Sequence, residues 1–211
     1  MDLTGGVAVR VSALCLDSRG RLADRLLCGT AVRAGLLLDL ALAGRLESED
    51  DSIVVDGTPT GFWPADRLLA AIDVEPERSL DEWLDETRIG LRDVAHANVV
   101  SGRWRLLRGP LGFGRRYVDL APERTARDLR RPSGAPDADR TPEDACVTAI
   151  ACASGLLERD SGLAEPPPAA VSAGAGRVTW LCAAVVEHLL EAGQRYRSEA
   201  GALGAGPVGP F

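Results

Sequence analysis

Arg33 is the residue of this sequence whose position most clearly indicates chemistry. It stands near the start of a long apolar segment, TAVRAGLLLDLALAGRLE, at residues 30–47. A charged side chain that enters a buried helix needs a partner, because burying an unpaired charge is costly. A helix start also favours a bound anion, through its unpaired backbone N–H groups and the positive end of its dipole. Three partners are open: a carboxylate such as Asp39, a nucleic acid, or the phosphate group of a ligand.

Catalytic chemistry has no comparable support in the sequence. The two histidines, His96 and His188, each stand alone on a predicted helix, and the chain has no serine-hydrolase, zinc-protease or phosphate-binding-loop motif. Its five cysteines lie mostly among apolar residues, without a CxxC pair or a histidine at ligand spacing. We therefore expect reduced thiols in the core, and no metal site, cofactor or catalytic residue.

Composition predicts one mainly helical domain. Of 211 residues, 45% are hydrophobic and only 4% aromatic, so the core must be built from leucine, valine and alanine, which suits packed helices. We expect a globular domain over residues 1–197 and a disordered tail over residues 198–211. No apolar run is long enough to span a membrane and no signal peptide is recognisable. A cytoplasmic protein is expected, with any membrane contact peripheral and on the inner face.

The apolar pattern predicts a central helix surrounded by shorter ones. Residues 31–46 are apolar nearly all round at helical spacing, which is typical of a buried helix. Residues 7–16 fit a helix or a strand equally well. Ser79 followed by Glu82 is a capping-box pattern that starts a short helix. Further helices are expected over residues 65–72, 88–100, 121–131, 142–158 and 177–196.

Two short strand pairs complete the predicted fold. Ile53–Val55 lies between acidic and turn residues, which is typical of one arm of a small hairpin over residues 47–58. Residues 103–120 alternate loosely on both sides of a glycine-rich break, which predicts a strand, a turn and a second strand in a wing-like arrangement. The expected fold is thus mainly α: a single globular helical domain around a central apolar helix, with a small β-hairpin and a short wing-like strand pair.

Charge is distributed unevenly along the chain. The formal net charge is -7, yet residues 103–131 hold nine arginines against three acidic residues, whereas residues 46–86 hold 13 acidic residues against two arginines. The basic segment also contains aromatic residues, as nucleic-acid sites do. The acidic total and the lack of a polar recognition helix argue against a nucleic-acid partner. Any anion site must therefore be local.

The order of these segments resembles the Golgi phosphoprotein 3 family, in its bacterial, actinobacterial branch. The matching pieces are VRAGLLLDLALAGRLE, TPTG, SLDEWL, a helix ending at Gly102, RRYVDL, AIACASGLLE and RVTWLCAAVVEHLL, in an order that covers residues 10–192. The resemblance implies a mostly helical globule around the central helix. Eukaryotic members are peripheral Golgi proteins that bind the phosphatidylinositol 4-phosphate head group, help to retain glycosyltransferases and carry no known catalytic site.

The resemblance also implies phosphate ligands. An arginine at the start of the family's central helix takes the head-group phosphate, and Arg33 matches it. Two further family cations lie three residues apart on the helix before the glycine stop. Counted back from Gly102, the first falls on Arg88 and the second on Leu91, with Arg92 one place later. Arg88 and Arg92 are one helical turn apart, so with Arg33 they would form a head-group site of two or three guanidinium groups.

Membrane contact is the part of the resemblance that this sequence changes. The family's membrane-touching tryptophan lies nine residues before the helix-start arginine, where this chain has Asp24. An apolar contact could come instead from leucines in the same loop or from the residues after the TPTG motif. The candidates are Leu22, Leu26, Leu27, Phe62 and Trp63.

Three functional hypotheses follow. The first is a non-enzymatic peripheral binder of anionic phospholipid head groups, of the phosphatidylinositol 4-phosphate type, or of another phosphorylated ligand. The second is a cytosolic adaptor that keeps the fold, binds protein partners and has lost lipid binding. The third is a small-molecule binder or enzyme of a bacterial biosynthetic pathway. The sequence leaves the oligomeric state open.

Overall fold

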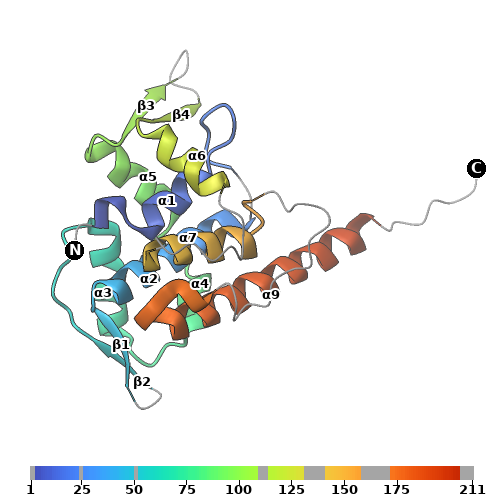
Figure 1. Ribbon diagram of the computed structural model, residues 1–211. Coiled ribbons are helices and arrows are strands. Elements are labelled where there is room, and N and C mark those ends of the chain that lie inside the picture. The colour runs from blue at the N-terminus through green and yellow to red at the C-terminus, as the bar shows by residue number, and fades with distance from the viewer. Residues whose placement is uncertain are drawn as a thin grey trace, which may run out of the picture.

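The computed structural model describes residues 3–23, 26–49, 52–108, 114–130, 141–157 and 172–204. It is mainly helical and has two small antiparallel sheets, as predicted. The two sheets lie at opposite ends of the molecule (Figure 1). Its longer helices are α1 (Val7–Leu14), α2 (Leu26–Leu42), α3 (Trp63–Val74), α5 (Leu91–Val100), α6 (Pro122–Arg130), α7 (Pro142–Ala153) and α9 (Thr179–Gly204). Shorter helical segments are η1 (Leu3–Gly5), α4 (Leu80–Asp85) and η3 (Ala173–Val178).

Helix α2 is the centre of the core, as its apolar circumference predicts. All of its residues from Thr30 to Leu42 are buried, and α1, α3, α7 and α9 pack on it. The approach to α1 is very close, because a Cβ atom on Gly35 would lie 2.7 Å from Cα of Ala8. Glycine at this position therefore allows the backbones of the two helices to touch.

The two sheets are hairpins. Strand β1 (Leu46–Glu49) pairs with β2 (Ser52–Val55), and β3 (Trp104–Arg108) pairs with β4 (Arg115–Asp119). The second hairpin has a small core of its own, in which Trp104 and Tyr117 pack with Ala13 of α1 and Ala95 of α5. This cluster fixes the β3–β4 hairpin to the helical body.

Several element boundaries differ from the sequence prediction. Residues 7–14 form a helix, which the pattern alone left undecided. Helix α5 begins at Leu91 rather than Arg88, because the Asp93 carboxylate accepts the backbone N–H of Gly90 and caps the helix there. Helix α9 continues past Tyr196 to Gly204, and residues 205–211 of the predicted tail lie outside the described residues. The capping box of Ser79 and Glu82 is confirmed, and no disulfide joins the five cysteines.

Asp39 is fully buried in the last turn of α2. Its two carboxylate oxygens accept the backbone N–H groups of Val7 and Ala8, at 2.7 and 2.9 Å, and so cap the start of α1. Burial raises the pKa of Asp39 to about 7, although both backbone hydrogen bonds act to lower it. A carboxyl group of α2 therefore holds the first turn of α1 in place.

This burial predicts a pH dependence of stability. The unfolded chain releases the Asp39 proton near its ordinary pKa of 3.8, whereas the folded chain keeps it up to about pH 7. The contribution of Asp39 to the free energy of unfolding should therefore fall as pH rises through that window, and level off above it. Urea unfolding of the wild type and of Asp39→Asn across the window measures this, and a difference between the two proteins that stays constant with pH would contradict it.

Candidate phosphate-binding site

Arg33 lies in the middle of α2, because the helix begins seven residues earlier, at Leu26. The sequence prediction of an arginine at the helix start is therefore wrong. Only 6% of the surface of Arg33 is exposed. Its Nε atom donates to the carbonyl oxygen of Leu84 at 2.7 Å, at the end of α4. Its Nη1 atom donates to the carbonyl oxygen of Ile89 at 3.4 Å, and its Nη2 atom to the hydroxyl oxygen of Thr30 at 3.2 Å. All three acceptors are neutral. Two of them, the carbonyl oxygens of Leu84 and Ile89, lie near the two ends of residues 84–90, which run from the last residues of α4 to the start of α5 and are called the α4–α5 connection.

The charge of Arg33 is not neutralised by an ion pair with any described residue. Burial lowers the pKa of Arg33, while the carboxylates of Asp85 and Glu86 act from a distance to raise it. The proposed pairing with Asp39 is wrong, because that carboxylate instead accepts two backbone N–H groups of α1. A guanidinium has five N–H groups, and three hydrogen bonds are seen here. Arg33 is thus a buried cation held by neutral groups.

The other two predicted phosphate ligands lie on either side of Ile89, whose carbonyl oxygen accepts from Arg33. Arg88 belongs to the α4–α5 connection, and its side chain is 79% exposed with Nε 3.7 Å from a carboxylate oxygen of Glu86. Arg92 is exposed on the first turn of α5. Between them, a Cβ atom on Gly90 would lie only 3.2 Å from Nη1 of Arg33. The structure therefore gathers Arg33 and Arg88 around one connection.

Arg92 faces a cleft that Arg33 does not line. The cleft has a volume of about 690 Å³ and lies between α5, the β3–β4 hairpin and the loop after α1. Its lining is Arg21, Leu22, Arg92, His96, Val99, Leu106, Gly114, Arg115 and Tyr117, and none of these described residues is acidic. Arg21 and Arg115 are not among the site residues predicted from the sequence. The only sequence feature that pointed to Arg115 was the excess of arginine over residues 103–131.

A second hollow is lined by both arginine and aspartate side chains. It has a volume of about 210 Å³, lies between α1, α6 and the base of the β3–β4 hairpin, and contains Arg10 and Asp128. There Arg10 donates to Asp128 from both Nε and Nη2. Arg103, Arg124 and Asp119 also line this hollow, which thus has three arginines against two carboxylates. It therefore has a smaller excess of positive charge than the cleft.

Comparison with known families identifies the family to which this chain belongs. The sequence model of the family described as Golgi phosphoprotein 3 (GPP34) matches residues 13–189, which is most of the chain. The chain belongs to the Golgi phosphoprotein 3 family. A search of curated proteins finds no significant match. Arg33, Arg88, Arg92 and the cleft all fall inside the stretch that the Golgi phosphoprotein 3 model matches.

The candidate membrane contacts of this Golgi phosphoprotein 3 family member differ in exposure. Phe62 is 4% exposed and has almost no surface to offer a membrane, whereas Trp63 is 38% exposed and lies edge-on against the His96 ring, with centroids 6.0 Å apart. Leu22 and Leu27 are partly buried. Asp24 and the side chain of Leu26 lie outside the described residues. Within the part of the chain that the structure describes, no helix is long and apolar enough to span a membrane.

Proposed function

We propose that this protein is a peripheral, non-enzymatic binder of anionic phospholipid head groups, of the phosphatidylinositol 4-phosphate type. The observation that carries the proposal is Arg33: a buried guanidinium with neutral acceptors and no ion pair among the described residues. Burying such a charge is costly, and a phosphate at the same place would offset that cost. Membership of the Golgi phosphoprotein 3 family supports the same function.

Arg88 and Arg92 are the other two ligands that we propose, Arg88 on the connection that Arg33 contacts and Arg92 in the cleft that Arg33 does not line. Both side chains are exposed, Arg88 on the α4–α5 connection and Arg92 on the first turn of α5. A head group can therefore reach them without any helix or strand unfolding. Charge-assisted hydrogen bonds contribute about 1.5 to 3 kcal/mol each, but desolvation and ordering of the side chains offset part of this. We therefore expect dissociation constants on the order of micromolar.

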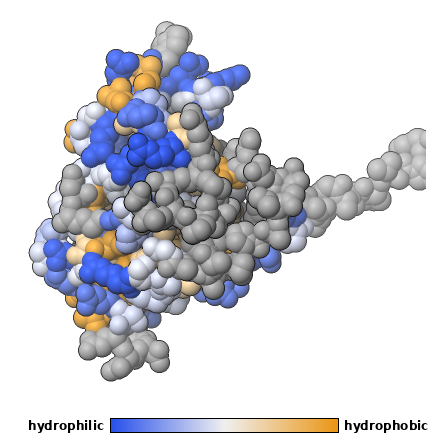
Figure 2. Space-filling view, viewed as in Figure 1, coloured by the Kyte–Doolittle hydropathy of each residue, from blue (hydrophilic) through white to orange (hydrophobic). Residues whose placement is uncertain are grey.

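The charge distribution sets how the protein would approach a membrane. Strongly hydrophilic residues gather at the β3–β4 end of the face seen in Figure 2, with hydrophobic ones among them. Near an anionic lipid surface, each basic side chain strengthens membrane binding by about 1 kcal/mol, and each acidic side chain weakens it by a similar amount. The arginine-rich end should therefore face the lipid, and the acidic residues of β1, α3 and α4 should face away.

The proposal predicts selective binding to anionic vesicles. Wild-type protein should sediment with vesicles that contain phosphatidylinositol 4-phosphate, less with phosphatidylglycerol and not with phosphatidylcholine alone. The double variant Arg88→Gln/Arg92→Gln should weaken binding about tenfold or more, since it removes two phosphate ligands from exposed positions. Sedimentation at several salt concentrations measures this.

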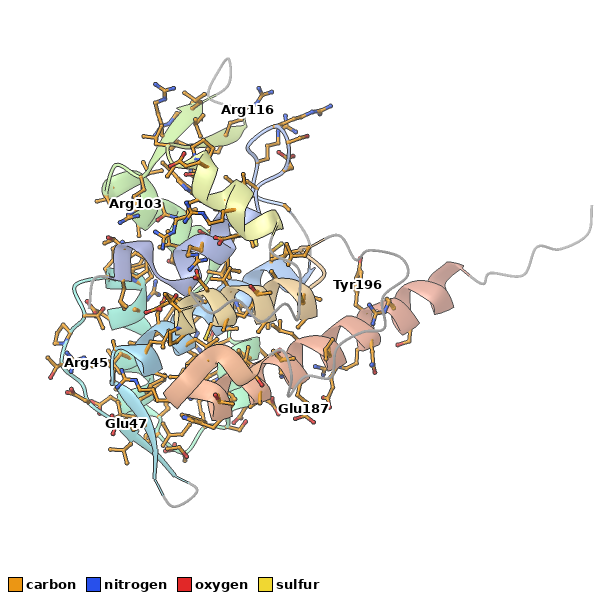
Figure 3. The ribbon with its side chains drawn as sticks, in the orientation of Figure 1. Arg45, Glu47, Arg103, Arg116, Glu187 and Tyr196 are labelled. Carbon is orange, nitrogen blue, oxygen red and sulfur yellow. The ribbon has the colours of Figure 1, made fainter. Side chains whose placement is uncertain are left out.

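A matched control comes from the other end of the molecule. Arg195 and Arg197 are exposed on α9, on either side of Tyr196, which Figure 3 shows far from Arg116 on the β3–β4 hairpin. Arg195→Gln/Arg197→Gln removes the same charge and should leave binding nearly unchanged. If the wild type binds none of the anionic vesicles, the lipid function is wrong and an adaptor for protein partners becomes the better hypothesis.

A further inference from the structure

The cleft beside Arg92 is built from three elements that are far apart in the sequence, and the first is the loop after α1. The backbone N–H of Tyr117 in β4 donates to the carbonyl oxygen of Gly20 at 2.6 Å. Gly20 has a φ of 71°, and a Cβ atom there would lie 2.4 Å from the Tyr117 carbonyl oxygen. Only glycine fits such a contact in this conformation. The contact fixes the next residue, Arg21, at the edge of the hairpin.

The second element is helix α5. Arg92, His96 and Val99 are spaced by four and three residues, so they share one face of the helix, and all three line the cleft. The rings of His96 and Trp63 form a T-shaped contact, with centroids 6.0 Å apart. Helix α5 thus supplies one cation, one imidazole and one apolar side chain to the same wall.

The third element is the β3–β4 hairpin. Leu106 lies directly opposite Tyr117, and Arg108 directly opposite Arg115. Because side chains alternate between the faces of a strand, all four share the face that lines the cleft. Two like charges directly opposite each other on one face are destabilising. The hairpin therefore concentrates positive charge on this face at some cost to its own stability.

The carboxylates nearest in sequence to Arg21 and Arg92 have other hydrogen-bond or ion-pair partners. Asp17 accepts the backbone N–H groups of Arg19 and Arg21, both at 2.8 Å. Asp93 accepts the N–H of Gly90 and lies 3.5 Å from Nη1 of Arg67. Across the parts of the chain that the structure describes, no carboxylate forms an ion pair with Arg21, Arg92 or Arg115.

We infer that this cleft is a binding site for a phosphate ester, with Arg21, Arg92 and Arg115 as the phosphate ligands. Guanidinium groups from three elements present planar, paired donors to one oxyanion, which suits a phosphate better than a single charge would. The apolar side chains of Leu22, Val99 and Leu106 cover the carbon skeleton next to the phosphate. The volume of about 690 Å³ lies within the usual range for small-molecule sites. Where the ester is a lipid head group, the inference rests on the proposed function and adds Arg21 and Arg115 to its site.

The inference is tested by titration calorimetry with soluble probes. The probes are dibutanoyl phosphatidylinositol 4-phosphate and glycerol 3-phosphate, which separate a lipid head group from a free phosphate ester. The variant Arg21→Gln/Arg115→Gln should weaken binding of whichever probe the wild type binds by about tenfold or more. The control Arg105→Gln/Arg116→Gln removes two arginines from the opposite face of the same hairpin and should change the affinity less than about twofold. Thermal melting checks that all proteins are folded.

The outcomes separate this inference from the proposed function. If Arg21→Gln/Arg115→Gln binds the probes as the wild type does, the cleft inference is overturned, even if vesicle binding still depends on Arg88 and Arg92. If glycerol 3-phosphate binds in the cleft but no vesicle binds, the inference holds and the lipid function fails. Failure of both probes to bind the wild type overturns the inference, as does binding of a single-stranded oligonucleotide in place of both.

Discussion

Replacing Arg33 by alanine should abolish binding to anionic vesicles and also lower the melting temperature by about 6 to 12 °C. The carbonyl oxygens of Leu84 and Ile89 would lose their donor, and a buried acceptor without a partner costs about 1 to 3 kcal/mol. A total of about 3 kcal/mol corresponds to this shift, because a domain of this size loses about 2 to 4 °C per kcal/mol. Vesicle sedimentation and thermal melting measure the two effects.

Two comparisons keep the effects of Arg33→Ala apart. Binding is measured well below the melting temperature of the variant, so that lost affinity does not reflect unfolding. Arg33→Lys keeps the charge but lacks the fork of donors, so it should bind more weakly than the wild type and more strongly than the alanine variant. Unchanged vesicle binding by a destabilised Arg33→Ala would show that Arg33 is purely structural, and the lipid site would have to be sought elsewhere.

Arg33→Ala should affect both binding and stability because Arg33 helps to hold the α4–α5 connection in place. Arg33 contacts both ends of the connection from α2. From the other side, His188 of α9 is buried between two carboxylates of α4, with Nδ1 2.8 Å from Asp81 and Nε2 3.2 Å from Asp85. The helix that ends at this connection is therefore fixed by α2 and by α9. A phosphate bound to Arg88 would meet a backbone that is already in place, which reduces the ordering cost of binding.

Local patterns account for the parts of the fold that the sequence predicted well. The central helix follows from an apolar circumference, and the start of α4 from the capping pair Ser79 and Glu82. Gly102, expected to end α5, has a φ of 74°, as helix-terminating glycines do. Each of these features is set within one element or at its border, where residue spacing is informative.

The site depended on contacts that no local pattern contains. The acceptors of Arg33 on Leu84 and Ile89 are backbone carbonyls, which any residue type supplies, so the sequence indicated only that a partner was needed. Arg21 and Arg115 come together because Gly20 and Tyr117 make a backbone contact across almost a hundred residues. The isolated His188 gave no hint of its two carboxylate partners, because they lie on α4.

Replacing Arg10 by methionine should reduce the free energy of unfolding by about 3 to 5 kcal/mol. Arg10 of α1 is 6% exposed and donates to both carboxylate oxygens of Asp128 in α6, and its Nη2 lies 2.7 Å from Asp144 of α7. The side chain of Asp128 is 1% exposed, so the variant would leave a buried carboxylate without its cation, and breaking such a pair costs about 3 to 5 kcal/mol. Urea unfolding at neutral pH measures it.

A double variant separates the cost of leaving Asp128 unpaired from the contribution of the Arg10–Asp128 ion pair to the free energy of unfolding. Arg10→Met/Asp128→Leu replaces the two most buried charges by apolar groups and should recover part of the stability, because a buried ion pair is often worth little more than apolar packing. Asp144, whose side chain is 14% exposed, still loses its cation. If the double variant is instead no more stable than Arg10→Met, the pair itself contributes the stability.

The pair also joins α6, which directly follows β4, to the helical core. Arg10→Met should therefore loosen the hairpin wall of the cleft and weaken phosphate-ester binding there, whereas the double variant should restore it.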